Sequence, residues 1–275
     1  MATIIEAVGL NKSFGAVTAA SDISVAIPEG DVVGLIGTNG AGKTTFVNMV
    51  TGYLKPDTGS IAYNGADITR LSPREITRLG ICRSFQIPQL YDTLTARENL
   101  AIGLGIVSRN AKKSMFSRLP KVMPGYDRNL WDTADLLLDQ FGLAPYRDRV
   151  AGALPEGVRK LLDITLALVS KPRVILLDEP TSGVSTDEKF AIMDRVMDVI
   201  RGAGVTVLFV EHDMDIVSRY ASRVLAFYDG RVLADGAVEA VLADADVRRL
   251  VVGSGHGTGS TAAQPGARQT AVDAN

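Results

Sequence analysis

The chain has 275 residues, 46% of them hydrophobic and 22% charged, which fits a globular protein with a sizeable core. Its net charge of −2 argues against a dedicated nucleic-acid-binding protein, because such proteins are usually basic. The single cysteine, Cys82, allows no internal disulfide, and we find neither a secretory signal nor an apolar run of the ~18 residues that span a bilayer. Any role at a membrane is therefore expected to be peripheral.

Strands and helices are predicted to alternate along most of the chain. Apolar runs rich in β-branched residues predict strands at residues 4–8, 23–27, 31–36, 174–178 and 205–210. A helix is expected to open near Lys43, and the Asp229-Gly230 pair between two apolar runs predicts a hairpin. This alternation favours a layered α/β core.

Three helix starts are marked by capping boxes, in which a Ser or Thr precedes a Glu by three residues. These pairs are Ser72 with Glu75, Thr95 with Glu98, and Ser185 with Glu188. Residues 86–160 have the composition of a mostly helical insertion. It includes a basic loop, 108–124, which is either solvated or close to an anionic membrane surface. Residues 253–275 are Gly, Ser, Thr and Ala with few large apolar side chains, so a disordered tail is expected there.

The segment GTNGAGKTT matches the phosphate-binding pattern G-x-x-x-x-G-K-[ST] and lies between a predicted strand and a predicted helix. Its glycines allow a tight turn in which backbone N–H groups converge on phosphate oxygens. Lys43 is expected to reach the β and γ phosphates, Thr44 to bind Mg²⁺, and Thr45 to cap the same turn. The alternative is a Gly-rich turn that binds nothing. The predicted nucleotide-binding residues of the loop are Gly37, Thr38, Asn39, Gly40, Ala41, Gly42, Lys43, Thr44 and Thr45.

Two acidic residues lie where the apolar run 174–178 ends. Asp178 is placed where a P-loop ATPase binds Mg²⁺, and Glu179 could orient or polarise a water for attack on the γ-phosphate. His212 follows the next apolar run, at the same edge of the sheet if the strands are parallel, and could hydrogen-bond the γ-phosphate and that water. Alone, an Asp-Glu-Pro turn or a surface histidine carries little weight. Their order downstream of the phosphate loop favours a catalytic site.

Together these motifs resemble the ATP-binding cassette (ABC) ATPases over about residues 3–252. The resemblance implies an α/β P-loop NTPase fold with a RecA-like core, an N-terminal antiparallel β subdomain and a helical subdomain inserted at about 86–160. It implies that Phe14 stacks on adenine and that Gln86 contacts Mg²⁺ and links the core to the helical subdomain. The implied cofactors are ATP and Mg²⁺. The implied metal ligands are Thr44, Gln86 and Asp178, and the implied catalytic residues are Glu179, His212 and Gln86.

Several features narrow the resemblance to the ATP-binding subunits of branched-chain amino acid importers. They are the stretches LIGTNGAGKTTFVNMVTGYLKPDTGSI, RLGICRSFQIPQLYDTLTARENL and FVEHDMDIV, the basic insertion, and the ending AVLADADVRRLVVG. Importers of urea and short amides share these features, so the solute stays open. The resemblance implies two cassettes that sandwich two ATP molecules at the cytoplasmic face of the cell membrane. Their closure pulls on two integral membrane permease subunits, and an extracytoplasmic solute-binding protein delivers the solute. The other functions considered are a non-transport ABC protein and a nucleotide-binding regulator that has lost catalysis.

The segment LPEGV falls where the family carries its signature motif, LSGGQ. Leu154 and Gly157 are kept. Pro155, Glu156 and Val158 replace a hydroxyl donor, a glycine and an amide. Pro155 is nevertheless suited to the first position of a helix, and Glu156 to a helix N-terminus. The segment is either an ordinary helix start at the interface or a working but altered signature. We expect an intermediate, which helps to close the dimer but contacts the partner's γ-phosphate more weakly.

A second departure lies in the loop TSGVST, where Ser185 stands in place of the aspartate that usually bridges the two cassettes. Both departures are on the surface that the resemblance assigns to the partner's ATP. The chain's own phosphate loop, Asp178, Glu179 and His212 are complete. We therefore expect an asymmetric heterodimer with a second ABC ATPase subunit, in which one composite site hydrolyses ATP faster than the other.

Overall fold

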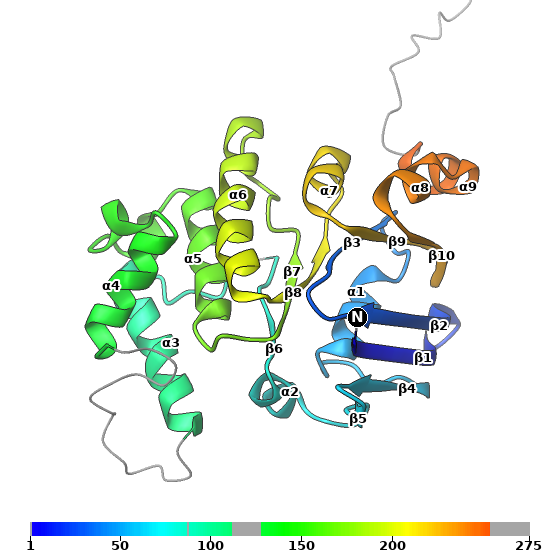
Figure 1. Ribbon diagram of the computed structural model, residues 1–275, viewed down its shortest axis with the longest axis horizontal. Coiled ribbons are helices and arrows are strands. Elements are labelled where there is room, and N and C mark those ends of the chain that lie inside the picture. Colours follow the sequence, from blue (N-terminus) through cyan, green and yellow to red (C-terminus); the bar gives the residue numbers. More distant parts are fainter. Residues whose placement is uncertain (1, 87, 112–127, 254–275) are drawn as a thin grey trace, which may run out of the picture.

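The computed structural model describes residues 2–86, 88–111 and 128–253. Within these ranges the strands form two sheets (Figure 1). The strands are β1 (Thr3–Phe14), β2 (Val17–Pro28), β3 (Val32–Gly37), β4 (Thr58–Tyr63), β5 (Ala66–Asp67), β6 (Ile81–Arg83), β7 (Val174–Asp178), β8 (Thr206–Val210), β9 (Arg223–Tyr228) and β10 (Arg231–Gly236).

A six-stranded sheet, in the order β10-β9-β3-β8-β7-β6, forms the centre of the fold. Strands β9, β3, β8, β7 and β6 run parallel, and only β10 is antiparallel to its neighbour. The second sheet, in the order β2-β1-β4-β5, is antiparallel throughout. An antiparallel β layer therefore packs beside a largely parallel α/β core, as the resemblance to ABC ATPases implies.

Helices cover the central sheet, and some of them continue the fold beyond one edge of the sheet. They are α1 (Lys43–Val50), α2 (Pro73–Leu79), α3 (Ala96–Ala111), α4 (Leu130–Gln140), α5 (Glu156–Leu168), α6 (Thr186–Ala203), α7 (Met214–Tyr220), α8 (Val238–Ala243) and α9 (Ala245–Val247). Short turns of tighter or wider helix occupy η1 (Ala144–Tyr146), η2 (Ala151–Ala153) and η3 (Arg248–Val252). Figure 1 shows α3, α4 and α5 grouped at the end of the molecule opposite the four-stranded sheet.

Two hydrophobic cores lie on the two faces of the central sheet, and β7 shows how the sequence divides between them. Ile175 and Leu177 face the core that is shared with the helices after α2, whereas Val174 and Leu176 face the core shared with the four-stranded sheet and α1. All four side chains are at most 1% exposed. A strand buried on both faces needs an unbroken apolar run, which is why residues 174–177 lack the alternation of a half-exposed strand.

Most predicted elements are confirmed, with one correction. The strands lie at the predicted runs, although β1 and β2 each extend to 12 residues. The hairpin is confirmed, with φ of 47° at Asp229 and 73° at Gly230. Both bonds of the capping box form at Ser72 and at Thr95. The box at Ser185 is wrong in one respect: its hydroxyl bonds the Glu188 carboxylate at 2.8 Å, but its side chain caps no backbone N–H group.

Two predictions concern segments that are largely outside the described residues. The predicted basic loop 108–124 overlaps the described chain only up to residue 111, and there the prediction is wrong, because residues 108–111 belong to α3. The predicted tail overlaps the described chain only at residue 253. The predicted helical insertion 86–160 contains α3, α4, η1 and η2 and the start of α5, which continues to Leu168. The division of the chain into subdomains stays a prediction.

Candidate functional site

The phosphate loop connects the end of β3 to the start of α1. Gly42 directly precedes α1 with a φ of 105°, and a Cβ atom there would lie 2.8 Å from the carbonyl oxygen of Ala19. A Cβ atom on Gly37 would lie 2.5 Å from the carbonyl oxygen of Phe227. Only glycine fits both positions. The loop can therefore turn tightly enough to present the N-terminus of α1, with its N–H groups and partial positive charge, to an anion.

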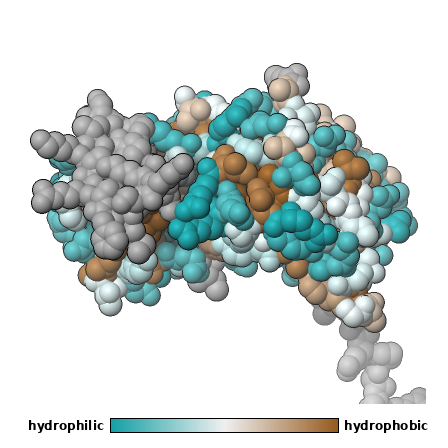
Figure 2. Space-filling model, turned by 90° about the horizontal axis from the view of Figure 1, so that it is seen from below, coloured by the Kyte–Doolittle hydropathy of each residue, from teal (hydrophilic) through white to brown (hydrophobic). Residues whose placement is uncertain are grey.

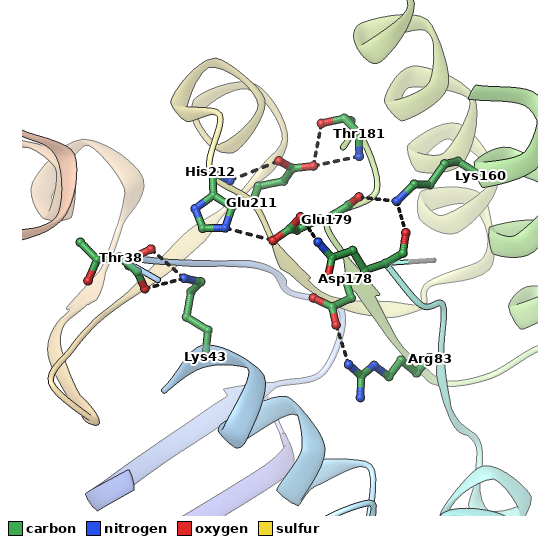
Figure 3. Close-up of polar contacts among 11 residues, drawn as sticks. Thr38, Lys43, Arg83, Lys160, Asp178, Glu179, Thr181, Glu211 and His212 are labelled. Carbon is green, nitrogen blue, oxygen red and sulfur yellow. Dashed lines mark hydrogen bonds and ion pairs between the residues drawn. The ribbon is translucent and has the colours of Figure 1, made fainter. Parts of the chain in front are cut away.

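Lys43, the first residue of α1, places one buried ammonium group at this loop. Its Nζ atom donates to the carbonyl oxygens of Gly37, at 2.7 Å, and Thr38, at 3.1 Å (Figure 3). Burial lowers the pKa of Lys43, while the negative charges of Glu179 and Asp178 act in the opposite direction. The lysine is therefore within electrostatic reach of both carboxylates, as expected for a group that contacts the outer phosphates.

Both carboxylates lie where β7 ends. Because β7 and β8 are parallel and Asp178 pairs with Val210, the residues that follow the two strands share one edge of the sheet, as predicted. Glu179 leaves the strand in a left-handed conformation, with a φ of 48°, and its N–H group donates to the carbonyl oxygen of Val210 at 3.0 Å. This conformation costs a non-glycine residue ~1–2 kcal/mol. The sharp turn gives the two adjacent carboxylates different surroundings.

The carboxylate of Glu179 is held between Gln86 and His212. The Gln86 amide donates to Oε2 at 2.7 Å, and Nε2 of His212 lies 3.1 Å from Oε1 (Figure 3). The Glu179 side chain is 21% exposed and that of His212 44%, so water can reach both. The structure thus brings together the three residues predicted to be catalytic. A carboxylate fixed in this way at a solvent-accessible edge can orient a water and accept its proton.

Lys160 supports this cluster from α5, and its role was not predicted. It is only 3% exposed, and its ammonium group donates to the carbonyl oxygens of Gln86 and, at 3.1 Å, of Glu179 (Figure 3). Burial lowers the pKa of Lys160, and the negative charges of the surrounding acidic residues offset only part of this effect. One side chain of α5 therefore holds the backbone of two catalytic candidates. A lysine within the buried stripe of a helix is the sequence signal that could have revealed it.

Glu211 is a second buried residue that sequence analysis missed. Its Oε1 atom accepts hydrogen bonds from the Thr181 N–H group at 3.0 Å and the Thr181 hydroxyl at 2.7 Å. Its Oε2 atom accepts one from the N–H group of His212 at 3.2 Å. Burial raises the pKa of Glu211 despite these donors. The carboxyl group therefore links the loop after β7 to the loop that carries the histidine.

Asp178 forms an ion pair with Arg83, the last residue of β6. Their side chains are 10% and 8% exposed, so the pair is largely buried. The arginine lies three residues before Gln86 in the predicted motif RSFQ, but nothing in that motif identified its partner. The neighbouring carboxylates thus have separate tasks: Glu179 is bound by an amide and an imidazole, and Asp178 by a guanidinium group.

The signature segment begins α5. The helix starts at Glu156, and Pro155 is the residue before it, so the prediction that Pro155 occupies the first helical position was wrong by one residue. Leu154 is 6% exposed and belongs to the core, and a Cβ atom on Gly157 would lie 3.1 Å from Cδ1 of Ile192 in α6. The two residues that match the family pattern are therefore needed for packing, whereas Pro155 and Glu156 are exposed.

The remaining predicted residues surround the phosphate loop. Phe14 is 53% exposed at the end of β1, and the next strand passes the loop where Ala19 approaches Gly42. Thr44 and Thr45 follow Lys43 in the first turn of α1. Asn39 and Gly40 are exposed at the tip of the loop, whereas Ala41 is buried, and its carbonyl accepts a hydrogen bond from the N–H group of Gly230 at 3.1 Å.

In the described part of the chain, no group of three or more His, Cys, Asp and Glu side chains could bind a metal by itself. A Mg²⁺ ion at a nucleotide needs fewer protein ligands, because phosphates and waters complete its octahedral shell. Asp178, the Thr44 hydroxyl and the side-chain oxygen of Gln86 are oxygen donors of the kind that Mg²⁺ prefers. Among the residues described, no helix is long and apolar enough to cross a membrane.

Comparisons with known proteins agree with this geometry. A family model described as "ABC transporter" matches residues 20–182. The relative named "Probable branched-chain amino acid transport ATP-binding protein LivG", from Methanocaldococcus jannaschii, is 33% identical over 256 residues, which cover 91% of this chain and 97% of the relative. The high-affinity branched-chain amino acid transport ATP-binding protein BraF of Pseudomonas aeruginosa is 32% identical over 253 residues, which cover 91% of this chain and 98% of BraF.

Solved structures agree as well. The ADP conformation of an ATP-binding cassette of an ABC transporter is 33% identical, with a TM-score of 0.78, and the match covers 91% of this chain and 98% of that one. The phosphate loop, the fold and the candidate catalytic cluster of Gln86, Glu179 and His212 therefore have the same explanation. The chain belongs to the ABC transporter family, as an ATP-binding cassette whose ATP hydrolysis is coupled to transport.

Proposed function

We propose that this chain is the ATP-hydrolysing subunit of an importer for branched-chain amino acids, bound peripherally at the cytoplasmic face of the membrane. The observation that carries the hydrolytic part is the Glu179 carboxylate held between Gln86 and His212, close to the buried Lys43. The printed names of LivG and BraF support the solute class. An importer of urea or short amides remains the second candidate, because its ATPases share the same motifs.

In this proposal the chain's own residues perform most of the chemistry. The phosphate loop and Lys43 bind the outer phosphates, Glu179 takes a proton from the attacking water, and His212 positions that water and the γ-phosphate. A Mg²⁺ ion held by Thr44, Gln86 and Asp178 would neutralise charge on the β and γ phosphates. Phe14, exposed beside the loop, would stack on adenine.

Replacement of the proposed base tests the hydrolytic role. Glu179→Gln is expected to lower kcat for ATP by about 10²–10⁴-fold, because general-base catalysis typically contributes that factor. ATP affinity should stay within a few-fold of wild type, since the phosphate loop is untouched. Glu239→Gln, an equal change at an exposed residue of α8, is the matched control and should retain full activity. A Glu179→Gln variant that hydrolyses ATP normally would exclude the assignment.

The solute is tested by transport rather than by hydrolysis. Cells that carry Glu179→Gln in place of the wild-type chain should lose energised uptake of radiolabelled leucine, isoleucine and valine. Normal uptake of these amino acids together with lost uptake of urea or acetamide would favour the second candidate. If these cells lose uptake of neither the amino acids nor urea and acetamide, and the chain still binds nucleotide, a nucleotide-binding regulator is favoured.

The altered signature supports a heterodimer with a second cassette. Pro155 and Glu156 are exposed at the start of α5, where they would meet the partner's ATP, and they supply neither a hydroxyl group nor a compact glycine. Glu179→Gln should trap ATP, so ATP-dependent dimerisation can be followed by light scattering. We expect this variant to stay monomeric alone and to pair with a cassette that carries LSGGQ. A stable ATP-bound homodimer would contradict the heterodimer.

The triple change Pro155→Ser, Glu156→Gly and Val158→Gln tests the signature directly. In the assembled transporter it should raise the ATPase rate, because it restores the hydroxyl and amide donors for the second ATP and removes a negative charge. An unchanged rate in the assembled transporter would mean that the altered signature does not limit hydrolysis.

Two integral membrane permease subunits are the proposed membrane partners, and a groove offers them a docking place. It has a volume of about 360 Å³ and lies between α2, β6 and α3, with Tyr53, Thr77, Arg83, Phe85, Tyr91 and Ile106 among its lining residues. In Figure 1, α2 and the lower end of α3 lie along the lower side of the molecule. The view from below in Figure 2 shows a small group of hydrophobic residues among hydrophilic ones near the middle of this side. Because the lining residues Arg83 and Phe85 lie just before Gln86 in the chain, a permease segment bound in the groove would lie close to the catalytic cluster.

Charge insertion at the groove tests this docking. Ile106→Asp should weaken co-purification with the permeases at least tenfold and leave the isolated chain's ATPase unchanged. Val8→Asp is a matched control, because both residues are 51% exposed and Val8 lies in β1 of the four-stranded sheet, not in the groove lining. Equal co-purification of the two variants would exclude the groove. An extracytoplasmic solute-binding protein would complete the importer without contacting this chain.

A further inference from the structure

Arg83 is more firmly fixed than an ordinary ion-pair partner. Its Nη1 atom donates to Oδ1 of Asn48 in α1 at 2.6 Å, and its Nη2 atom donates to Oδ2 of Asp178. The guanidinium group also lies 5.1 Å from the ring centre of Phe85 and 5.9 Å from that of Tyr53, and these two rings meet edge to face. Two hydrogen bonds and two aromatic contacts hold the Arg83 guanidinium group, so the fold fixes the position of this cation.

The sheet explains why this cation reaches the site. Strands β6 and β7 are parallel, and Arg83 lies opposite Leu176, two residues before Asp178. A long side chain at that position reaches the carboxylate at the end of the next strand. Figure 3 shows Arg83 approaching Asp178 from the side opposite Glu179 and His212. The guanidinium group engages only one oxygen, Oδ2, so Asp178 retains a second oxygen for another cation.

This placement changes the charge balance of the site. Asp178 and Glu179 are adjacent carboxylates. Lys43 acts on both of their charges and Lys160 on that of Glu179, whereas Arg83 is the cation that pairs directly with Asp178. Without Arg83, Asp178 would repel the phosphates of a nucleotide and attract a divalent cation more strongly. A fixed guanidinium group reduces both effects, because opposite charges a few ångströms apart interact strongly in a partly buried site.

We propose that Arg83 is the resident counter-cation of Asp178 and sets how strongly nucleotide binding depends on a divalent cation. This inference rests on the proposed Mg²⁺ site. Arg83 lowers the affinity of Asp178 for Mg²⁺ by charge repulsion and raises the affinity of the site for metal-free nucleotide by charge neutralisation. Both effects make the affinities for ATP with and without Mg²⁺ more similar. Arg83 is thus a positioning residue that acts on the metal and the nucleotide through Asp178.

The test measures binding of a fluorescent ATP analogue to the full chain, once with Mg²⁺ and once with EDTA. In Arg83→Gln the ratio of Kd in EDTA to Kd in Mg²⁺ should rise about tenfold or more above the wild-type ratio, through weaker binding in EDTA. Arg83→Lys retains the charge and should keep the ratio within about threefold of wild type. Arg173→Gln is the control for net charge, because Arg173 pairs with Glu29 at the opposite end of β7 and is 53% exposed.

Each outcome decides the proposal. If Arg83→Gln and Arg83→Lys weaken binding equally under both conditions, the ratio is unchanged, the role is structural, and the inference is wrong. If Arg83→Gln does not fold, Arg83→Met is used, since its apolar chain can fill the space beside Phe85 and Tyr53. If neither neutral variant folds, the arginine serves stability and the inference also fails. If Mg²⁺ changes the Kd of neither the wild type nor Arg83→Gln, the proposed metal site is contradicted and the inference falls with it.

Discussion

Removal of the buried ammonium group of Lys160 is expected to damage catalysis more than nucleotide binding. Lys160→Met keeps most of the apolar stem, which is buried in α5, but removes the donor for the carbonyl oxygens of Gln86 and Glu179. Both carbonyls belong to residues whose side chains meet in the catalytic cluster. The change should therefore let the two backbones move relative to each other without altering the phosphate loop.

The magnitude follows from these two contacts. A hydrogen bond to a charged group contributes about 1.5–3 kcal/mol, and the ammonium group's own desolvation cost, visible in its lowered pKa, offsets part of the sum. A net loss of about 2 kcal/mol is expected, which corresponds to a fall in Tm of about 4–8 °C for a chain of this size. Misplacement of reacting groups by about 1 Å can cost ~10²-fold in rate, so kcat should fall at least ~10-fold.

Steady-state ATPase kinetics and thermal unfolding are measured on the same preparations. Lys55→Met is the matched control, because Lys55 also donates to a backbone carbonyl, that of Leu71, and its pKa is also lowered by burial. It should lose stability but keep kcat and KM. Lys160→Met should keep KM within a few-fold while kcat falls. A Lys160→Met variant with a kcat within twofold of wild type would refute the reasoning.

Three further changes test other parts of the structure. Lys43→Ala should weaken ATP binding about 10–100-fold, measured by calorimetry, because it removes charge-assisted bonds of about 1.5–3 kcal/mol. Phe46→Ala should lower the free energy of unfolding by about 3–5 kcal/mol in urea, since Phe46 is fully buried. The raised pKa of Glu211 means that the native state binds its proton more tightly than the unfolded chain, so stability should fall as pH rises from about 4.5 through the native pKa. Glu211→Gln should make that fall shallower, and an unchanged slope would contradict the assignment.

The sequence predicted the parts of the site that lie within continuous motifs. The phosphate loop, Asp178, Glu179 and His212 each follow a strand, and an apolar run of five or six residues is enough to predict that strand. The parallel arrangement of β7 and β8 then brings the predicted residues to one edge. Periodicity and turn chemistry act over short distances, so these features could be found without knowing the tertiary structure.

The residues that support the site could not be found in the same way. The bond from Arg83 to Asp178 spans 95 positions and that from Lys160 to Gln86 spans 74. A charged residue in an apolar stripe signals a buried partner, but only the packed fold shows which one. The errors at the two helix starts have local causes. Pro155 has an extended ψ angle of 150°, which places it just before α5 and not in its first turn. Ser185 lies at the start of α6 as predicted, but its hydroxyl group donates to the Glu188 carboxylate and so caps no backbone N–H group.

In the proposed dimer, α5 connects the partner's ATP to this chain's own catalytic cluster within one helical turn. Glu156 is exposed at the start of the helix. Lys160 follows four residues later on the same side of the helix and interacts electrostatically with the Glu156 carboxylate. Between them Gly157 packs closely on Ile192, which leaves little space for the helix to tilt freely. Charge repulsion between the partner's γ-phosphate and Glu156 would therefore displace α5 as a rigid unit. This displacement would move the Lys160 ammonium group relative to Gln86 and Glu179. Glu156→Gly should reduce that repulsion, so it is expected to raise hydrolysis at this chain's own site only while Lys160 is present. An equal gain in the Lys160→Met background would show that the two ends of the turn act independently.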